Sequence, residues 1–278
     1  MQKANIKLNG HTWQVYLRDE ADQSVFNEIF ELKEYRSAED VIKTAKHPII
    51  DVGAHAGFFS MYCRALNQKV KIFAVEPESE NLKLLKQHLA DNKILGVEVV
   101  AGALAKETGE RELLISKDSH NHRLIDYNSN VILSETKDPS RLYKRDSSVT
   151  PQNDNRIAVV RSFAFPDFCR QNKIKKISLL KMDIEGGEYE LFDGMSADDF
   201  AMVNFVILEY HNISSKPVSR LSHKQIEEKL RANGFGVQVF PSHFDKTMGF
   251  IWANNKRAKP HPSPHPVYGR VKGRGICF

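Results

Sequence analysis

The sequence predicts an α/β protein with a mostly parallel sheet, helices on both faces of that sheet and an antiparallel hairpin at its C-terminal end. Short apolar runs, typical of buried strands, alternate along the chain with amphipathic segments typical of helices, which is the pattern of parallel sheets. The last two expected strands, 236–240 and 250–253, have no helix between them, which indicates an antiparallel edge.

The first 45 residues predict a small cap made of a hairpin and a helix. Apolar residues alternate over residues 5–18 around Asn9-Gly10, which is a strong hairpin signal. Residues 22–35 place apolar side chains among acids in a helical pattern. We therefore expect three parts: the cap 1–45, a main domain 46–258 and a basic, proline-rich tail 259–278.

The most informative segment joins the first core strand, expected at 49–52, to a helix expected at 57–66. The strand ends at Asp51, and Gly53 and Gly57 follow in a short turn. Glycines permit a tight turn and a close approach to a ligand, so this turn predicts a nucleotide-sized pocket. The spacing differs from the dinucleotide fingerprint, and Asp51 would repel a pyrophosphate. S-adenosylmethionine, with its cationic centre and amino group, suits that carboxylate.

A second strand, expected at 71–77, ends in another acid, Glu76. This residue lies about half a βαβ unit after the glycines, where a carboxylate can accept hydrogen bonds from both hydroxyls of an adenosine ribose. A turn glycine or a strand-end acid alone is often only structural. Together, Asp51 and Glu76 predict one shared cofactor pocket.

The rest of the main domain continues the alternation of strands and helices. Ser222, Gln225 and Gly234 mark the ends of one helix through a capping box and a C-terminal glycine. The remaining expected elements are a helix at 78–92, a strand at 97–101, a strand at 156–162, a short helix at 167–172, a strand at 177–183, a helix from 188, a strand at 203–209 and a helix at 222–233.

Residues 116–156 break the pattern, because Ser, Asn, Asp and Lys dominate there. A long polar stretch inside a compact domain is either a functional loop or a passive one. We interpret it as an insertion over the active site, and a passive flexible loop fits almost as well. His120 and His122 lie in it, and we expect them to be solvated rather than metal ligands.

A second acidic motif follows the strand at 177–183. Asp183 ends that strand and Glu185 follows before Gly186-Gly187, so both carboxylates can reach the cleft at the carboxyl ends of the strands. Glu209 and His211 end the next strand and alternate to the same side. We expect Asp183, Glu185 and His211 to be catalytic, with His211 as general base, although His211 could equally be a structural residue at a strand end. Asp183, Glu209 and His211 could instead hold Mg²⁺ or Mn²⁺.

Composition narrows the location and the partners. The apolar runs are too short to span a membrane, the N-terminus has no apolar signal core and the three cysteines show no paired spacing, which together predict a cytoplasmic protein. The net charge is +5, but residues 256–278 hold six Lys and Arg and no acid, which leaves −1 for the rest. Nucleic acid is therefore not an expected partner of the folded body, whereas the tail could contact a membrane surface.

The two motifs, Ile50-Asp51-Val52-Gly53-Ala54-His55-Ala56-Gly57 and Leu180-Lys181-Met182-Asp183-Ile184-Glu185-Gly186, together with Val75-Glu76-Pro77, resemble the FkbM family of S-adenosylmethionine-dependent methyltransferases. The resemblance covers roughly residues 45–212 and implies a Rossmann-like methyltransferase fold. It implies a reaction centre at Asp183 and Glu185. The cofactor-binding residues that it implies are Asp51, Gly53, His55, Gly57, Phe58, Glu76, Gly102 and Ala103.

The sequence thus predicts an O-methyltransferase with S-adenosylmethionine as cofactor and a hydroxyl of a saccharide or glycan-like molecule as acceptor. One alternative is an RNA or protein methyltransferase of the same fold, with the basic tail gripping an anionic partner. Another is a binding module that keeps the cofactor pocket without turnover. A nicotinamide-dependent dehydrogenase is disfavoured by the glycine spacing.

Overall fold

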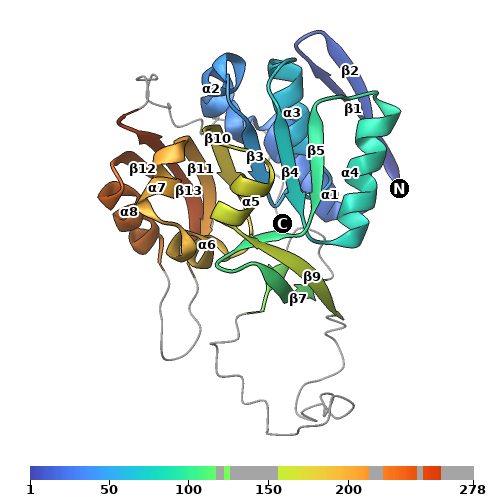
Figure 1. Ribbon diagram of the computed structural model, residues 1–278. Helices are drawn as coiled ribbons and strands as arrows, with labels where there is room; N and C mark the ends of the chain where they lie inside the picture. The colour runs from blue at the N-terminus through green and yellow to red at the C-terminus, as the bar shows by residue number, and fades with distance from the viewer. Residues whose placement is uncertain (117–121, 126–155, 213–221, 243–246, 258–278) are drawn as a thin grey trace, which may run out of the picture.

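A computed structural model describes residues 1–116, 122–125, 156–212, 222–242 and 247–257 (Figure 1). The tail 259–278 and most of the expected insertion 116–156 therefore lie outside the described residues. The described chain is built around a seven-stranded sheet, a two-stranded hairpin and a four-stranded sheet.

The seven-stranded sheet has the order β12-β13-β11-β10-β3-β4-β5. β13 is antiparallel to both of its neighbours, and the pairs of the other strands are parallel. The strands are β3 (Ile49–Val52), β4 (Ile72–Glu76), β5 (Val97–Ala101), β10 (Ile177–Met182), β11 (Val203–His211), β12 (Phe235–Pro241) and β13 (Met248–Asn255). This arrangement confirms the predicted α/β class and the antiparallel hairpin at its C-terminal end.

Helices cover both faces of this sheet because neighbouring strand residues point to opposite sides. Ile49 of β3 belongs to one hydrophobic cluster and Ile50 to the other. The first cluster contains side chains of α2 (Glu39–Thr44), α3 (Phe58–Leu66) and α4 (Ser79–Asp91). The second contains those of α5 (Phe165–Gln171), α6 (Glu188–Gly194), α7 (Ala197–Met202) and α8 (His223–Ala232).

The N-terminal hairpin, β1 (Gln2–Leu8) and β2 (His11–Leu17), has the predicted turn at Asn9-Gly10. Its buried side chains, such as Trp13 and Val15, belong to the same cluster as α3 and α4. The hairpin therefore packs on the main domain through a shared core, beside α4 (Figure 1).

The expected single helix at 22–35 is wrong. α1 (Glu20–Phe26) passes into a π-helical turn η1 (Asn27–Glu31), and a separate 3₁₀ helix η2 (Glu34–Ala38) follows. Lys33 between them has a left-handed φ of 57°, which an α-helix does not accommodate. Phe26, Phe30 and Tyr35 contact aromatic rings of α3, so tertiary packing sets this path.

The four-stranded sheet, of order β6-β9-β7-β8, was not predicted as a separate sheet. Its strands are β6 (Ala103–Ala105), β7 (Gly109–Ile115), β8 (Arg123–Leu124) and β9 (Arg156–Ala164). β9 confirms the strand expected at 156–162. Because β6 follows β5 after a single residue, Gly102, this sheet stands at the carboxyl edge of the main sheet, where β7 and β9 are seen in Figure 1.

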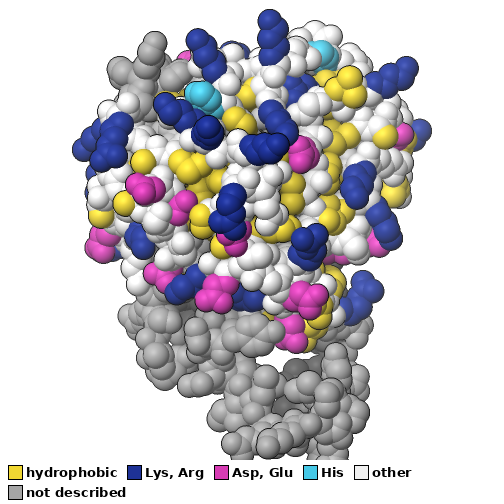
Figure 2. Space-filling model, in the orientation of Figure 1, with side chains coloured by type: hydrophobic (Ala, Val, Ile, Leu, Met, Phe, Trp, Pro, Cys, Tyr) yellow, Lys and Arg dark blue, Asp and Glu magenta, His cyan; other side chains and the backbone are white. Residues whose placement is uncertain are grey.

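The surface of the described residues mixes the two signs of charge. Figure 2 shows basic side chains spread over the visible face with acidic ones among them. This agrees with the net charge of −1 that the sequence leaves for residues 1–255. Within the described residues, no helix is long and apolar enough to cross a membrane.

Candidate cofactor and acceptor site

A cavity lies at the carboxyl ends of β3, β4 and β10, which is where open α/β sheets bind ligands. The space between its lining residues amounts to about 890 Å³, which includes open solvent. Its lining includes Val25, Glu28, Ile29, Tyr35, Gly53, Ala54, His55, Phe58, Phe59, Glu76, Pro77, Asn81, Ala103, Leu104, Leu113, His122, Leu124, Lys181, Asp183 and Ile184.

The turn between β3 and α3 has the glycines that its packing requires. Gly53 has a φ of 73°, and a Cβ there would stand 1.9 Å from the carbonyl oxygen of Asp183. Gly57 has a φ of 86°, and a Cβ there would stand 2.9 Å from Leu85 on α4. Gly53 lines the cavity and Gly57 does not. The close approach at Gly57 is thus to a neighbouring helix, whereas the sequence led us to expect a ligand there.

Glu76 ends β4 and lines the cavity, as expected. Its Oε2 accepts a hydrogen bond from the backbone N–H of His55 at 2.8 Å. Its Oε1 accepts from the N–H of Glu78 at 2.9 Å and from the side-chain amide of Asn81 at 3.3 Å. Burial raises the pKa of this carboxyl, and these donors oppose the rise. A carboxylate has about four acceptor positions, so one remains, on Oε2.

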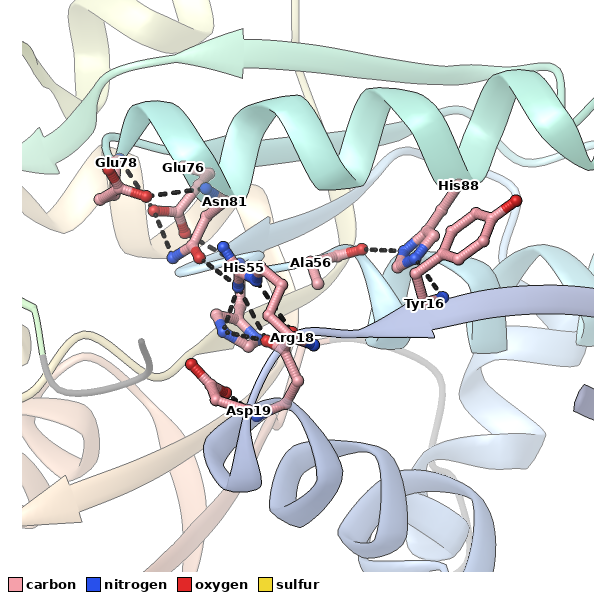
Figure 3. Close-up of polar contacts among 10 residues, drawn as sticks. Tyr16, Arg18, Asp19, His55, Ala56, Glu76, Glu78, Asn81 and His88 are labelled. Carbon is pink, nitrogen blue, oxygen red and sulfur yellow. Dashed lines mark hydrogen bonds and ion pairs between the residues drawn. The ribbon is translucent and has the colours of Figure 1, made fainter. Parts of the chain in front are cut away.

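A polar network ties the N-terminal segment to this turn (Figure 3). Arg18, just after β2, donates to both carboxylate oxygens of Asp22, at 2.9 and 2.8 Å, and to the side-chain oxygen of Asn81 at 2.7 Å. Asp22 is fully buried and also lies 3.2 Å from His55 Nε2. Although burial opposes it, hydrogen bonding by Arg18 and His55 lowers the pKa of Asp22 well below its usual range. Sequence reasoning missed Arg18 and Asp22, and it noted Asn81 only as part of the family resemblance, with no role.

Asp51 points to the same face of the sheet as Glu76 but does not line the cavity. Its carboxylate accepts from Ser60 Oγ at 2.8 Å and lies 3.3 Å from Lys181 Nζ. Lys181 also donates to the carbonyl oxygen of Gly53 at 2.9 Å. Burial raises the pKa of Asp51, while Lys181 opposes that rise. Asp51 is therefore placed to hold the turn through Lys181 and not to touch a ligand in this cavity.

Of the other residues predicted to bind the cofactor, some line the cavity and one does not. His55, Phe58 and Ala103 line the cavity, while Gly102 does not. A Cβ at Gly102 would meet the carbonyl oxygen of Arg161 and the ring of Phe163 on β9, both at 2.8 Å. This glycine therefore lets the four-stranded sheet approach the end of β5 closely.

Three of the residues predicted to be catalytic or to hold a metal lie close together at the ends of β10 and β11. Asp183, Glu185 and His211 each place one possible ligand atom within 4.8 Å of the others, and Glu185 Oε2 lies 3.6 Å from His211 Nε2. Glu209, the other metal candidate, is not part of this group within the described residues. Burial, followed by Asp183 and Glu188, raises the pKa of Glu185 to about 8.

The N-terminal segment supplies one wall of the cavity, which sequence reasoning did not foresee. Val25, Glu28 and Ile29 come from α1 and η1, and Tyr35 comes from η2. Burial, followed by Glu28 and Asp183, raises the pKa of neighbouring Glu34 to about 7. In the sequence, Glu34 and Tyr35 stand in an amphipathic stretch, and such a pattern does not by itself indicate a binding site.

His122 also differs from expectation. We expected it to be solvated, but it is half-buried, lines the cavity and accepts a hydrogen bond from the N–H of Ser116 at 3.1 Å. It is not among the possible metal-binding groups found in the described part of the chain. His120 lies outside the described residues.

Comparison with known proteins identifies this protein as a methyltransferase. The model of the methyltransferase FkbM domain matches residues 51–237, and the chain belongs to this family of S-adenosylmethionine-dependent enzymes. The resemblance inferred from the two motifs is therefore confirmed, and the α/β core is the Rossmann-like methyltransferase fold.

Similar proteins carry related names. Methyltransferase sdnD of Sordaria araneosa is 26% identical over 228 residues, which cover 77% of this chain and 82% of that protein. Methyltransferase 1 of Beauveria bassiana is 21% identical over 205 residues, 69% of this chain and 73% of that protein. Among solved structures, fibrillarin of Aeropyrum pernix with bound S-adenosyl-L-methionine has a TM-score of 0.45 and 10% identity, over 90% of this chain and 82% of that one.

Proposed function

We propose that this methyltransferase transfers a methyl group from S-adenosylmethionine to a hydroxyl of a saccharide or glycan-like acceptor. The observation that carries the proposal is one cavity with two chemically different ends. Glu76 lies at one end, on β4, and Asp183 lies at the other, after β10. A nucleoside-binding end and a proton-accepting end in one cavity are what methyl transfer to oxygen requires.

The residues at the first end fit the cofactor. Glu76 lines the cavity, and the remaining acceptor position on its Oε2 suits a ribose hydroxyl. His55, Phe58 and Ala103 would contact the cofactor, while Gly53, Gly57 and Gly102 shape the backbone around it. When bound, S-adenosylmethionine supplies a methyl group on a sulfonium sulfur. Asp51 acts indirectly in this proposal, because it holds Lys181 and through it the turn.

The second end would orient the acceptor and take its proton. Asp183 lines the cavity there, whereas Glu185 and His211 do not line it and are grouped with Asp183. Because the pKa of Glu185 is raised to about 8, this side chain is mostly protonated at neutral pH. Asp183 and His211 are then the available proton acceptors, and an imidazole ordinarily titrates near neutrality. We assign His211 as general base, with Asp183 and Glu185 beside the reacting oxygen.

The proposal has two further parts, a bound metal ion and a cellular location. Asp183, Glu185 and His211 could hold Mg²⁺ or Mn²⁺, whose usual ligands include carboxylates. A cytoplasmic location is also proposed, and the two described cysteines, Cys63 and Cys169, are buried thiols outside any disulfide. Membrane contact through the tail is a prediction on residues outside the described ones.

The test follows a labelled methyl group. Full-length protein is incubated with methyl-labelled S-adenosylmethionine and separate glycan, RNA and protein fractions of its native cells, with and without chelator. Label in an ether linkage to the glycan fraction supports the proposal, and its loss with chelator adds the metal. Label in the RNA or protein fraction alone would favour the rival methyltransferase. Cofactor binding without transfer to any fraction would favour the binding module.

A further inference from the structure

The amino edge of the main sheet, opposite the cavity, is formed by the loops that lead into the strands. Four of these loops precede the neighbouring strands β10, β3, β4 and β5, and they span residues 172–176, 45–48, 67–71 and 92–96. We call these four loops the basic edge, because they contain no acid and seven lysines: Lys46, Lys69, Lys71, Lys93, Lys173, Lys175 and Lys176. The whole chain has 40 basic and 35 acidic residues, so its overall composition does not account for this separation of charge.

Backbone hydrogen bonds hold the four loops side by side. The N–H of Ser178 donates to the carbonyl oxygen of Pro48 at 2.9 Å and that of Ile49 to Lys71 at 2.9 Å. The N–H of Ile72 donates to the carbonyl oxygen of Gly96 at 3.1 Å. At about 4.8 Å per strand, the row from β10 to β5 is roughly 14 Å wide.

A buried arginine fixes two of these loops further. Arg64 on α3 is only 4% exposed, and its guanidinium donates to the carbonyl oxygens of Asn67 at 2.9 Å, Val70 at 2.7 Å and Gly96 at 2.7 Å. The guanidinium thus joins the loop before β4 to the loop before β5. The basic edge is therefore a preformed surface.

The charges of the basic edge are available to a partner. All seven lysines are exposed, and Lys71 pairs with Glu98 at 2.6 Å. Among the described residues, no acid forms an ion pair with the other six. Figure 2 shows basic side chains projecting at the top of the molecule, where β3, β4 and β5 begin in Figure 1. Like charges on neighbouring strands repel one another, and an anionic surface would offset that repulsion.

An apolar side chain stands among these lysines. Leu95, in the loop before β5, is 82% exposed, more than any other large hydrophobic residue of the described chain. Its neighbours hold it there, because Ile94 belongs to the first hydrophobic cluster and Gly96 is bound by Arg64. A single exposed leucine is common, but one held among clustered lysines has the composition of surfaces that bind membrane interfaces.

We infer that the basic edge binds the surface of a bilayer that contains anionic lipids, with Leu95 inserted among the headgroups. The lysines would face the anionic headgroups, which attract each such charge near the surface. A nucleic acid is disfavoured, because its recognition relies on arginine forks and aromatic stacking. The four loops contain no Arg, Phe, Tyr or Trp. The inference does not depend on which acceptor is methylated.

The predicted membrane contact of the tail agrees with this surface. Asn255, the last residue of β13, donates through Nδ2 to the carbonyl oxygen of Val203, the first residue of β11. β13 therefore ends at the amino edge, and the exposed Lys256 and Arg257 follow it. The tail 259–278, whose residues lie outside the described ones, follows directly after them in the sequence and is basic as well.

This orientation would turn the cavity toward water. The strands run from the basic edge to the cavity, and the five residues of β4 span roughly 17 Å at about 3.3 Å per residue. An acceptor would then reach Asp183 from the aqueous side and not from the hydrocarbon region.

The test measures binding of the full-length protein to lipid vesicles by flotation. Vesicles of phosphatidylcholine alone are compared with vesicles that also contain phosphatidylglycerol. We expect binding to the anionic vesicles at low salt and little to the neutral ones. Binding should weaken as salt is added, because the attraction is between exposed charges.

Variants locate the contact. The triple variant Lys93→Gln, Lys175→Gln and Lys176→Gln should bind the anionic vesicles at least about tenfold more weakly. Leu95→Gln should weaken binding severalfold. The matched control is the triple variant Lys83→Gln, Lys86→Gln and Lys224→Gln, which removes three exposed charges from α4 and α8 and should stay within about twofold of wild type. Melting temperature and affinity for S-adenosylhomocysteine should be unchanged in all of them, since none of these residues lines the cavity.

Three results would overturn the inference. The first is no binding to anionic vesicles at low salt. The second is an equal loss of binding in the two triple variants, because binding would then follow net charge and not this surface. The third is binding to an RNA oligonucleotide that needs Lys93, Lys175 and Lys176 while Leu95→Gln leaves vesicle binding unchanged, which would assign the basic edge to nucleic acid.

Discussion

The two ends of the cavity differ in how far their polar groups are satisfied. At the Glu76 end, both carboxylate oxygens accept hydrogen bonds from the protein, and Arg18 and Asn81 complete a closed network. At the Asp183 end, burial, followed by neighbouring acids, raises the pKa values of Glu34 and Glu185. The hydrogen-bonded end is preorganised for its ligand, whereas the Asp183 end holds acids whose pKa values their surroundings raise.

The difference matters because the two ends have different tasks. The cofactor is the same in every turnover, so a rigid site for it limits the loss of conformational entropy on binding. The acceptor end has to discriminate between molecules, and buried groups left unpaired by a wrong acceptor supply that discrimination. The following variants should therefore divide into those that change turnover, those that change folding and those that change cofactor affinity.

The largest expected effect is on turnover and comes from His211→Asn. Loss of the general base should lower kcat about 10²- to 10⁴-fold while the affinity for S-adenosylhomocysteine stays within twofold. Steady-state transfer and calorimetry measure the two quantities. A variant that keeps wild-type kcat would remove His211 from the chemistry and favour Asp183 as the proton acceptor.

Asp22→Asn should have the next largest effect, on folding. The carboxylate of Asp22 is fully buried and pairs with Arg18, so its neutralisation should lower the free energy of unfolding by about 3 kcal/mol in urea titrations. The pKa of Asp22 is lowered in the folded state, so this stabilisation is present above the unfolded pKa near 4 and is lost as pH falls.

The matched control for Asp22→Asn is Asp193→Asn, because Asp193 pairs with Lys106 at the surface. That variant should change the free energy of unfolding by less than about 1 kcal/mol. Equal effects of the two substitutions would contradict a structural role for the Arg18 network.

Glu76→Gln should weaken cofactor binding by about 10- to 100-fold, which corresponds to one hydrogen bond to a charged group. The amide keeps one acceptor oxygen but places donors opposite the N–H groups that now point at the carboxylate. Glu98→Gln on neighbouring β5 is the control, because Glu98 is half-exposed and pairs with Lys71 at the surface. Calorimetry compares the affinities of the two variants for S-adenosylhomocysteine. Equal affinities would contradict the assignment of Glu76 to the cofactor.

The smallest expected effect is a pH-dependent gain of stability in Glu34→Gln. The pKa of Glu34 is raised to about 7 in the folded state, so the folded state binds more protons than the unfolded state between about pH 4.3 and 7. Stability is therefore lost as pH rises through this window. The variant should melt a few degrees above wild type at pH 8 and at the same temperature at pH 4. A difference that is independent of pH would contradict a raised pKa of Glu34 in the folded state.

Short sequence patterns sufficed to predict the turns and helix ends whose structure depends on neighbouring residues. The Asn9-Gly10 turn and the glycine-bent turn after β3 were found where expected. So was the start of α8, where the N–H of Ser222 donates to Gln225 Oε1 at 3.0 Å. Glu76 was placed at the cavity because a strand-end acid after a βα unit has a fixed relation to the glycine turn.

The parts that were missed depend on contacts between distant segments. Tyr35 and Glu28 enter the cavity only because the aromatic residues around them pack on α3 and break the expected helix. Asp51 was assigned to the ligand because the sequence does not show that Lys181, on the neighbouring strand, takes its carboxylate. The four-stranded sheet depends on β6 and β7, which are short or largely polar and carry a weak alternating pattern.

A crystal structure of the full chain with S-adenosylhomocysteine would test the central claim most directly. We predict that a ribose hydroxyl lies within hydrogen-bond distance of Glu76 Oε2, that the sulfur points toward Asp183, and that the space beside Asp183 stays open to an acceptor. A ligand bound elsewhere, or one whose ribose lies away from Glu76 and whose amino acid part fills the space between Glu28 and Tyr35, would contradict the division of the cavity into two ends.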